Sequence, residues 1–241
     1  LLLYHSRTNY MRITECINYF FYKNFVATLC QFLFGFYCNF TGQTIIDDWF
    51  ITLFNLLFTS LPLGVKALMD HDIKSTDGNI VYKMLPFIYK ENRENPIFTI
   101  PNFLLILLNG ILHSLLNAFW IIYIVKEEPV NIDGQMGDLW YMSVNIYTNI
   151  LLIVSINLMI FTKYFTWMNF IILFLITFAS YAVFLIIVES WDIFNSVGTI
   201  RVAFLSPVLW MNLFFICGSC MLIDFFTLSY SFVFKPNTIN E

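Results

Sequence analysis

The chain has 241 residues, of which 59% are hydrophobic and only 12% are Asp, Glu, Lys or Arg. A soluble domain has about 25% charged residues, so this composition excludes an ordinary water-soluble fold. The net charge of −4 excludes a general nucleic-acid binder, and the 28 Phe and 13 Tyr favour packed helices in lipid. The five cysteines have no metal-binding spacing with histidine, so the sequence indicates neither a zinc site nor a disulfide framework.

Six apolar segments are long enough to cross a membrane as helices. A transmembrane helix needs about 20 mostly apolar residues, and the alternating pattern of a membrane barrel is absent. The sequence therefore predicts an all-α membrane protein with a bundle of six transmembrane helices. The predicted spans are residues 13–40, 49–68, 98–125, 139–161, 167–188 and 202–230.

The positive charges predict the orientation of these spans. Nine of the 12 Lys and Arg fall in the N-terminal segment, in the two loops on the same side, and at the C-terminus. Because cytosolic loops are enriched in Lys and Arg, we expect both termini in the cytosol. This gives a cytosolic stalk at 1–14, a transmembrane domain at 15–233 and a cytosolic tail at 234–241. The first residues lack the pattern of a signal peptide, and we expect a longer polypeptide.

Lys23 is the most informative residue of the first predicted span. At 1.5 Å per residue it lies about 16 Å along a helix from Arg12, near the middle of a hydrocarbon core about 30 Å thick. An ionisable group there is costly and normally faces a partner, a cavity or a pathway. Two interpretations stay open. Lys23 either snorkels or pairs structurally with a polar neighbour, or it faces a transport pathway.

Polar residues follow at helical spacing in the first two spans. Partly broken, polar helices at mid-membrane are typical of transport sites, although the same residues also serve as hydrogen bonds between helices. No Asp or Glu lies in residues 16–46 or 49–69, so this region suits a polar or anionic group better than a cation. The two stripes, each expected to share one helix face, are Asn24, Thr28 and Gln31, and Thr52, Asn55, Thr59 and Pro62.

The polar residues of the later spans are interpreted as packing contacts, because small and amide side chains bring helices together. Asp224 is expected near the cytosolic end, paired and without a catalytic role. The chain has no phosphate-binding loop and no nucleophile triad. The packing residues are Asn109, His113 and Asn117 in the third span, and Asn145, Asn149 and Ser155 in the fourth.

Short segments along the whole chain match one known pattern in the right order. They are LLLYHSRTNYMRI (1–13), FFYKNF (20–25), GQT (42–44), FNLLFTSLP (54–62), LNGILHS (108–114), YTN (147–149), TKYFTW (162–167), SPVLWMNLFFI (206–216) and LID (222–224). Together they resemble the C-terminal half of the membrane domain of type IV P-type ATPases, the phospholipid flippases. The resemblance implies the fifth to tenth helices of a ten-helix P-type ATPase membrane domain.

The resemblance also implies an activity. Such an enzyme is a translocase that uses ATP and Mg to move aminophospholipid-type lipids from the exoplasmic to the cytosolic leaflet. Its phosphorylation and nucleotide-binding domains, which bind ATP and Mg, lie outside this segment, and so we expect no catalytic residue and no metal site here. The Lys-Asn pair of the family's fifth helix falls on Lys23 and Asn24, and its sixth-helix Asn falls on Asn55. With Thr28 and Thr59 as weaker candidates, these are the expected substrate-binding residues.

The expected partners are a phospholipid, the remaining N-terminal part of the same ATPase, and a glycosylated two-span accessory subunit that docks on the acidic exoplasmic loops. No nucleic acid is expected. The protein is expected to be a multi-pass integral membrane protein of the plasma membrane or of late secretory or endosomal membranes. The alternative is a non-catalytic flippase-like membrane module of a larger signalling protein, such as a guanylate cyclase fusion. A cation pump and an unrelated six-span channel or receptor fit the residues less well.

Overall fold

All the elements in the described part of the chain are helices. The computed structural model describes residues 2–69, 98–125, 134, 136–162, 167, 171, 175, 177–191 and 196–234. The predicted tail beyond residue 234 and most of the loop between the second and third predicted spans lie outside these residues. The elements are α1 (Leu2–Tyr37), α2 (Asp48–Leu53), the π-helix η1 (Phe54–Phe58), α3 (Ser60–Met69), α5 (Ile100–Trp120), the π-helix η2 (Ile121–Val125), α6 (Leu139–Ile160), α8 (Thr177–Ser190), α9 (Thr199–Leu205) and α10 (Pro207–Phe234).

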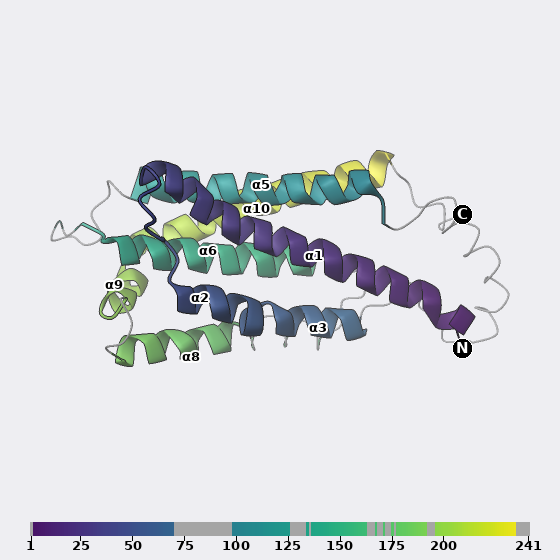
Figure 1. Ribbon diagram of the computed structural model, residues 1–241, viewed down its shortest axis with the longest axis horizontal. Helices are drawn as coiled ribbons and strands as arrows, with labels where there is room; N and C mark the ends of the chain where they lie inside the picture. Colours follow the sequence, from purple (N-terminus) through teal and green to yellow (C-terminus); the bar gives the residue numbers. More distant parts are fainter. Residues whose placement is uncertain are drawn as a thin grey trace.

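The long helices run side by side along one axis of the molecule (Figure 1). α5 and α10 lie together along the top of the view, α1 crosses the bundle diagonally, and α2, α3 and α8 lie along the lower side. α1 packs mainly on α5, and α6 packs mainly on α10. α6 is the central helix, because 78% of its apolar window is buried, against 28% for the window in Asp48–Leu68.

Four helical segments are long and apolar enough to cross a membrane: Asp48–Leu68, Ile100–Tyr123, Leu139–Ile160 and Pro207–Ser229. α8 is apolar but shorter, with 14 residues. α1 has 36 residues, but its middle carries Lys23 and Asn24, and it is not among the four. The all-α prediction is therefore confirmed for the described residues, whereas the total of six transmembrane helices stays a prediction.

Side-chain caps and prolines set several of the helix ends. The carboxylates of Asp47 and Asp138 each accept a hydrogen bond from a backbone N–H of the turn that follows, as N-cap residues do. Ser206 has an extended backbone and separates α9 from α10, which begins at Pro207. A residue before proline is disfavoured in the helical region. The predicted span 202–230 therefore includes the end of α9 and most of α10.

An aromatic cluster holds the second predicted span against α6. Phe50, Phe54 and Phe58 are all buried and pack around Tyr147, with the Phe50 and Tyr147 ring centroids 4.7 Å apart. The Tyr147 hydroxyl donates a hydrogen bond to the Phe50 carbonyl at 3.0 Å. Aromatic pairs with this edge-to-face geometry contribute beyond the area that they bury. The cluster thus fixes one side of α2 and η1.

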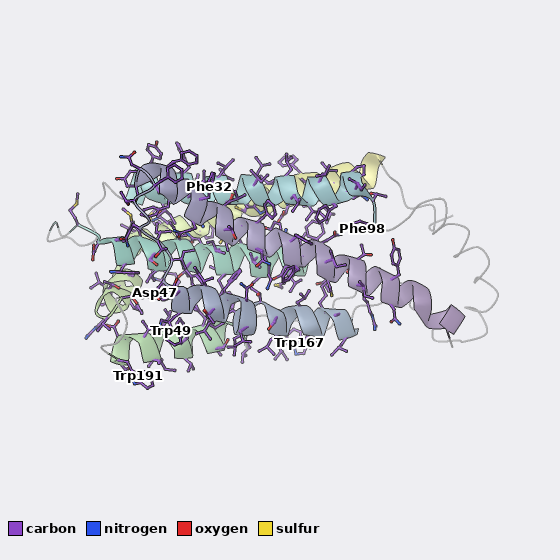
Figure 2. All side chains as sticks on the ribbon, viewed as in Figure 1. Phe32, Asp47, Trp49, Phe98, Trp167 and Trp191 are labelled. Atoms are coloured by element: carbon purple, nitrogen blue, oxygen red, sulfur yellow. The ribbon has the colours of Figure 1, made fainter. Side chains whose placement is uncertain are left out.

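Large aromatic side chains also lie on the outside of the bundle. Trp49 and Trp191 are both more than half exposed, and Figure 2 shows them with Asp47 near the same end of the molecule. Tryptophan is enriched where a membrane meets water, because its ring is apolar and its N–H is polar. The positions of these two residues are those expected for one interface of a membrane-spanning bundle.

Candidate functional site

Lys23 lies in the middle of α1 with only 2% of its surface exposed. Its Nζ donates a hydrogen bond to the Thr59 hydroxyl at 2.5 Å. The same Nζ lies 5.4 Å from the ring centroid of Phe20 and 5.7 Å from that of Phe54, within the range of a cation–π contact. Within the described residues, no carboxylate pairs with this ammonium. Lys23 is therefore a buried cation whose partners there are all neutral.

The π-helix η1 places Thr59 at this position. The Thr59 N–H bonds the Phe54 carbonyl at 3.2 Å, which is the i to i+5 pattern of a π-turn. The Thr59 hydroxyl donates to the same carbonyl at 2.6 Å while it accepts from Lys23. The hydroxyl is therefore held from two sides, and a local irregularity in the helix joins it to α1. π-turns of this kind occur frequently at functional sites.

The other three predicted site residues lie on more open surface. Asn24 is half-buried, whereas Thr28 and Asn55 are exposed. No side-chain hydrogen bond joins any of them to Lys23 or Thr59. The structure thus brings together the Lys23 and Thr59 side chains and leaves Asn24, Thr28 and Asn55 available to another molecule.

The prediction that Thr52, Asn55, Thr59 and Pro62 share one helix face is wrong. Thr52 and Asn55 are exposed, whereas Thr59 is 3% exposed. Their spacing gives a shared face only in a regular α-helix, which turns about 100° per residue. The extra residue in η1 shifts the phase of the helix, so Thr52 and Thr59 point in different directions.

Gln31, at the end of the first polar stripe, has a structural role. Its Oε1 accepts hydrogen bonds from the backbone N–H groups of Ile45 at 3.1 Å and Ile46 at 3.4 Å. Both of these residues lie in the loop between α1 and α2 and are buried. Gln31 therefore anchors that loop to α1. Its role is structural, and it is not part of the site around Lys23.

A second polar cluster, which we call the Asp224 cluster, joins four helices. The Asp224 carboxylate is 1% exposed and accepts hydrogen bonds from Asn109 Nδ2 at 2.5 Å and from Asn157 Nδ2 at 2.9 Å. His113 Nε2 lies 3.6 Å from the same carboxylate, and His113 Nδ1 is hydrogen-bonded to the Tyr22 hydroxyl at 2.6 Å. The cluster therefore links α1, α5, α6 and α10. Its residue in α1 is Tyr22, which directly precedes Lys23.

Sequence reasoning found only part of this cluster. The spacing of Asn109 and His113 placed both on one face of a helix, and Asp224 was expected to have a partner. The identity of that partner depends on contacts between residues 67 and 115 positions apart in the chain. The packing interpretation is supported elsewhere, because Asn117 donates to the Ile146 carbonyl at 3.3 Å and so joins α5 to α6.

The described residues contain no group of three or more His, Cys, Asp or Glu that could hold a metal ion.

Comparison with known proteins assigns the family. A family model described as "Phospholipid-translocating P-type ATPase C-terminal" matches residues 1–237. The chain belongs to this family. It is a multi-pass membrane protein segment of the flippases, as the resemblance implied.

Individual relatives agree with the family model. The chain is 39% identical over 170 residues to "Probable phospholipid-transporting ATPase IM" of Homo sapiens, which covers 70% of the chain and 14% of the relative. It is 32% identical over 230 residues to "Phospholipid-transporting ATPase ID" of Mus musculus, and 29% identical over 232 residues to "Phospholipid-transporting ATPase IC" of Homo sapiens. Each of these two alignments covers 92% of the chain and 18% of the relative.

The chain thus spans less than a fifth of the length of these relatives. All three are named as phospholipid-transporting ATPases, which are translocases. These names do not favour the alternative of a non-catalytic module in a signalling protein.

Proposed function

We propose that the chain forms the C-terminal membrane part of an ATP-driven flippase that moves aminophospholipid-type lipids from the exoplasmic to the cytosolic leaflet. The family match over residues 1–237 and the names of the relatives support this activity. The structural observation that carries it is Lys23, a buried cation without a carboxylate partner in the described part of the chain, beside a π-turn. A transported headgroup with a phosphate or carboxylate would supply the missing charge.

The chemistry of Lys23 suits such a headgroup. An ammonium has three hydrogen-bond donors, and the Thr59 hydroxyl takes one of them. A buried charge is costly unless it is paired and hydrogen-bonded, and hydrogen bonds between an ammonium and a phosphate are among the strong ones. The arrival of a phosphate therefore stabilises Lys23 far more than a neutral hydroxyl does. Binding of an anionic headgroup is therefore favoured, because it pairs the Lys23 ammonium with an opposite charge.

We place Asn24, Asn55 and Thr28 along the same path. Asn24 follows Lys23 directly in α1, and Asn55 lies in η1, which is followed directly by the Lys23 partner Thr59. Their amide groups both donate and accept hydrogen bonds, so they suit the polar atoms of a passing headgroup. Their partial or full exposure leaves them accessible to a lipid.

The same proposal includes the cofactors, the partners and the membrane of the full-length protein. ATP and Mg would act in cytosolic domains outside this segment, and the remaining N-terminal part of the ATPase would complete the membrane domain. A glycosylated two-span accessory subunit would dock on the acidic exoplasmic loops. The protein would act in the plasma membrane or in late secretory or endosomal membranes.

The test uses the purified full-length protein with its accessory subunit, and measures ATPase activity over a titration of phospholipid. Losing one hydrogen bond to a charged group costs about 1.5–3 kcal/mol, which is roughly a 10- to 150-fold loss of apparent lipid affinity. We expect this loss for Lys23→Ala and a shift in the same direction for Asn55→Ala, with phosphorylation by ATP retained. Lys23→Arg keeps the charge and should retain more affinity than Lys23→Ala.

Thr52→Val is the matched control, because Thr52 is exposed in the same span and bonds only its own helix through the Asp48 carbonyl. A structural lysine predicts a different pattern from a headgroup lysine. If Lys23→Ala and Asn55→Ala keep the wild-type lipid response while Lys23→Ala merely lowers the folded yield, Lys23 only holds α1 against η1, and the site proposal fails.

A further inference from the structure

A second lysine of the described residues, Lys66, is also buried. It lies in α3 with 6% of its surface exposed, and its ammonium lies 3.5 Å from the Glu15 carboxylate of α1. The same ammonium donates a hydrogen bond to the Phe161 carbonyl at 2.9 Å. Phe161 is the C-cap of α6, and the last carbonyls of a helix have no partner inside that helix. Lys66 therefore joins α3 both to α1 and to the end of α6.

The two lysines connect α1 with the second predicted span at two heights. α1 and α3 pack against each other and run in opposite directions (Figure 1). Lys23 of α1 bonds Thr59, and Lys66 of α3 pairs with Glu15 of α1. Glu15 precedes Lys23 by eight residues and Thr59 precedes Lys66 by seven, which correspond to about 12 and 10.5 Å of helix. Because these lengths match, both contacts form at once and together fix the height and the rotation of α3 on α1.

The Lys66 contacts also hold the π-turn in η1 open. The Thr59 N–H bonds the Phe54 carbonyl, five residues before it. If this turn closed to the ordinary i to i+4 pattern, α3 would rotate by about 100° relative to α2, and Lys66 would leave Glu15. The aromatic cluster around α2 fixes the other flank to α6. The ion pair therefore opposes closure of the π-turn and keeps Thr59 directed toward α1.

We propose that Lys66 is a positioning residue of the headgroup site, which acts through Thr59 on Lys23. This inference rests on the function proposed above for Lys23. A lysine ammonium sits on a flexible four-carbon stem, so its place along the path depends on the groups that hold it. Thr59 supplies the hydrogen bond that holds the Lys23 ammonium, and the contacts of Lys66 keep Thr59 in register. Lys66 itself needs no contact with the lipid.

The two lysines differ in their charge partners. Lys66 faces the Glu15 carboxylate, whereas no carboxylate pairs with Lys23 within the described part of the chain. The charge of Lys66 is therefore already compensated, and an anionic headgroup gains less there than at Lys23. This difference assigns lipid binding to Lys23 and positioning to Lys66.

The experiment uses the purified full-length protein with its accessory subunit, and measures ATPase activity over a titration of the phospholipid that stimulates the wild type most among phosphatidylserine, phosphatidylethanolamine and phosphatidylcholine. Lys66→Met removes the charge and keeps an unbranched side chain. It should raise the half-saturating lipid concentration roughly tenfold, with phosphorylation by ATP and the maximal rate retained. This shift lies inside the roughly 2- to 150-fold range of coupled neighbours. Lys66→Arg keeps the ion pair and the donor, and should restore most of the affinity.

The decisive variant combines Lys66→Met with Lys23→Ala. If Lys66 acts through Lys23, its effect on lipid affinity disappears once Lys23 is gone, and the double variant has the same half-saturating concentration as Lys23→Ala. Independent contributions would instead multiply. A merely structural role does not produce this pattern, because a lower folded yield changes the amount of active enzyme and not the lipid concentration at half-maximal rate.

Two more variants complete the series. Glu15→Gln should act in the same direction as Lys66→Met. It is the milder change, because the Glu15 side chain is 20% exposed and Lys66 keeps its bond to Phe161. Thr162→Val is the matched control, since the Thr162 hydroxyl bonds the Leu158 carbonyl inside α6, next to the end that Lys66 contacts. It should keep the wild-type lipid response.

The outcomes separate this inference from the proposed function. If Lys23→Ala shifts the lipid response while Lys66→Met and Glu15→Gln keep the wild-type response, Lys66 does not position the site and the inference fails alone. The same holds if the shifts of Lys66→Met and Lys23→Ala multiply in the double variant. If Lys23→Ala itself leaves the lipid response unchanged, the proposed function fails and this inference fails with it.

Discussion

The Asp224 cluster makes a quantitative prediction about how four helices are held together. Asp224→Asn replaces a carboxylate that accepts from Asn109 at 2.5 Å and from Asn157 at 2.9 Å. The new amide has one oxygen and one NH₂ group, so one of the two neighbours meets a donor instead of an acceptor. The side chain is 1% exposed, and water cannot take over the lost bond. We therefore expect Asp224→Asn to destabilise the bundle without any change of side-chain volume.

The expected coupling free energy of the Asp224–Asn157 contact is bounded by two known ranges. Hydrogen bonds between helices in membranes average about 0.6 kcal/mol, with a maximum near 1.7, and hydrogen bonds to charged groups in proteins are worth about 1.5–3 kcal/mol. For the Asp224–Asn157 contact we expect a coupling of about 1–2 kcal/mol, which is a factor of 5 to 30 in an equilibrium constant. This coupling is separable from the effects of the single variants by a double-mutant cycle.

The cycle compares the wild type, Asp224→Asn, Asn157→Leu and the double variant of the full-length protein, in mixed micelles with increasing SDS and constant choline chloride. The control cycle pairs Asp224→Asn with Thr148→Val, because the Thr148 hydroxyl bonds Tyr181 at 2.8 Å, outside the cluster. The control pair should be additive. If the Asp224–Asn157 pair is also additive within about 0.3–0.5 kcal/mol, the carboxylate does not hold α6, and the reasoning is refuted.

Two further predictions concern close contacts between helices. Gly110→Val should lower the folded yield and speed thermal inactivation, because even a Cβ at Gly110 would lie 3.3 Å from the Tyr22 ring and overpacking costs about 1–3 kcal/mol. Gly218→Val is the control and should be tolerated, because a Cβ there meets nothing within 4 Å. Equal effects of the two variants would contradict the close approach of α1 and α5. Tyr147→Phe removes the 3.0 Å hydrogen bond to the Phe50 carbonyl and keeps the ring, so it should cost about 0.5–1.5 kcal/mol of stability in SDS titration. An unchanged midpoint would show that the ring contacts alone hold α2 against α6.

Apolar length and helical spacing predicted the all-α architecture and the position of Lys23 near the middle of its span. The helix assignment needs only local information, because every backbone group in lipid must be satisfied within its own segment. The depth of Lys23 followed from its distance to Arg12 along one helix, whereas the burial of its side chain is a finding of the structure. Asn109 and His113 lie four residues apart, which puts them on one face of a helix, and packing contacts were predicted for both.

Other features depend on contacts that the spacing of residues does not contain. η1 interrupts a segment whose residues gave no sign of a π-turn, and it is surrounded by buried rings of α6 and α8. The partners of Asp224 come from two other helices. None of these could be predicted without knowing which helices are neighbours.

The π-turn at Phe54–Phe58 has a consequence for insertions and deletions. A regular helix turns about 100° per residue, so deleting one residue of α3 before Lys66 rotates every later side chain by that angle and moves Lys66 away from Glu15. A residue deleted inside η1 has a different effect, because the i to i+5 turn can close into an ordinary i to i+4 turn. The two flanks then keep their faces, with Phe50 toward α6 and Lys66 toward α1. Homologous chains that differ in length by one residue in this span should therefore carry the gap within η1.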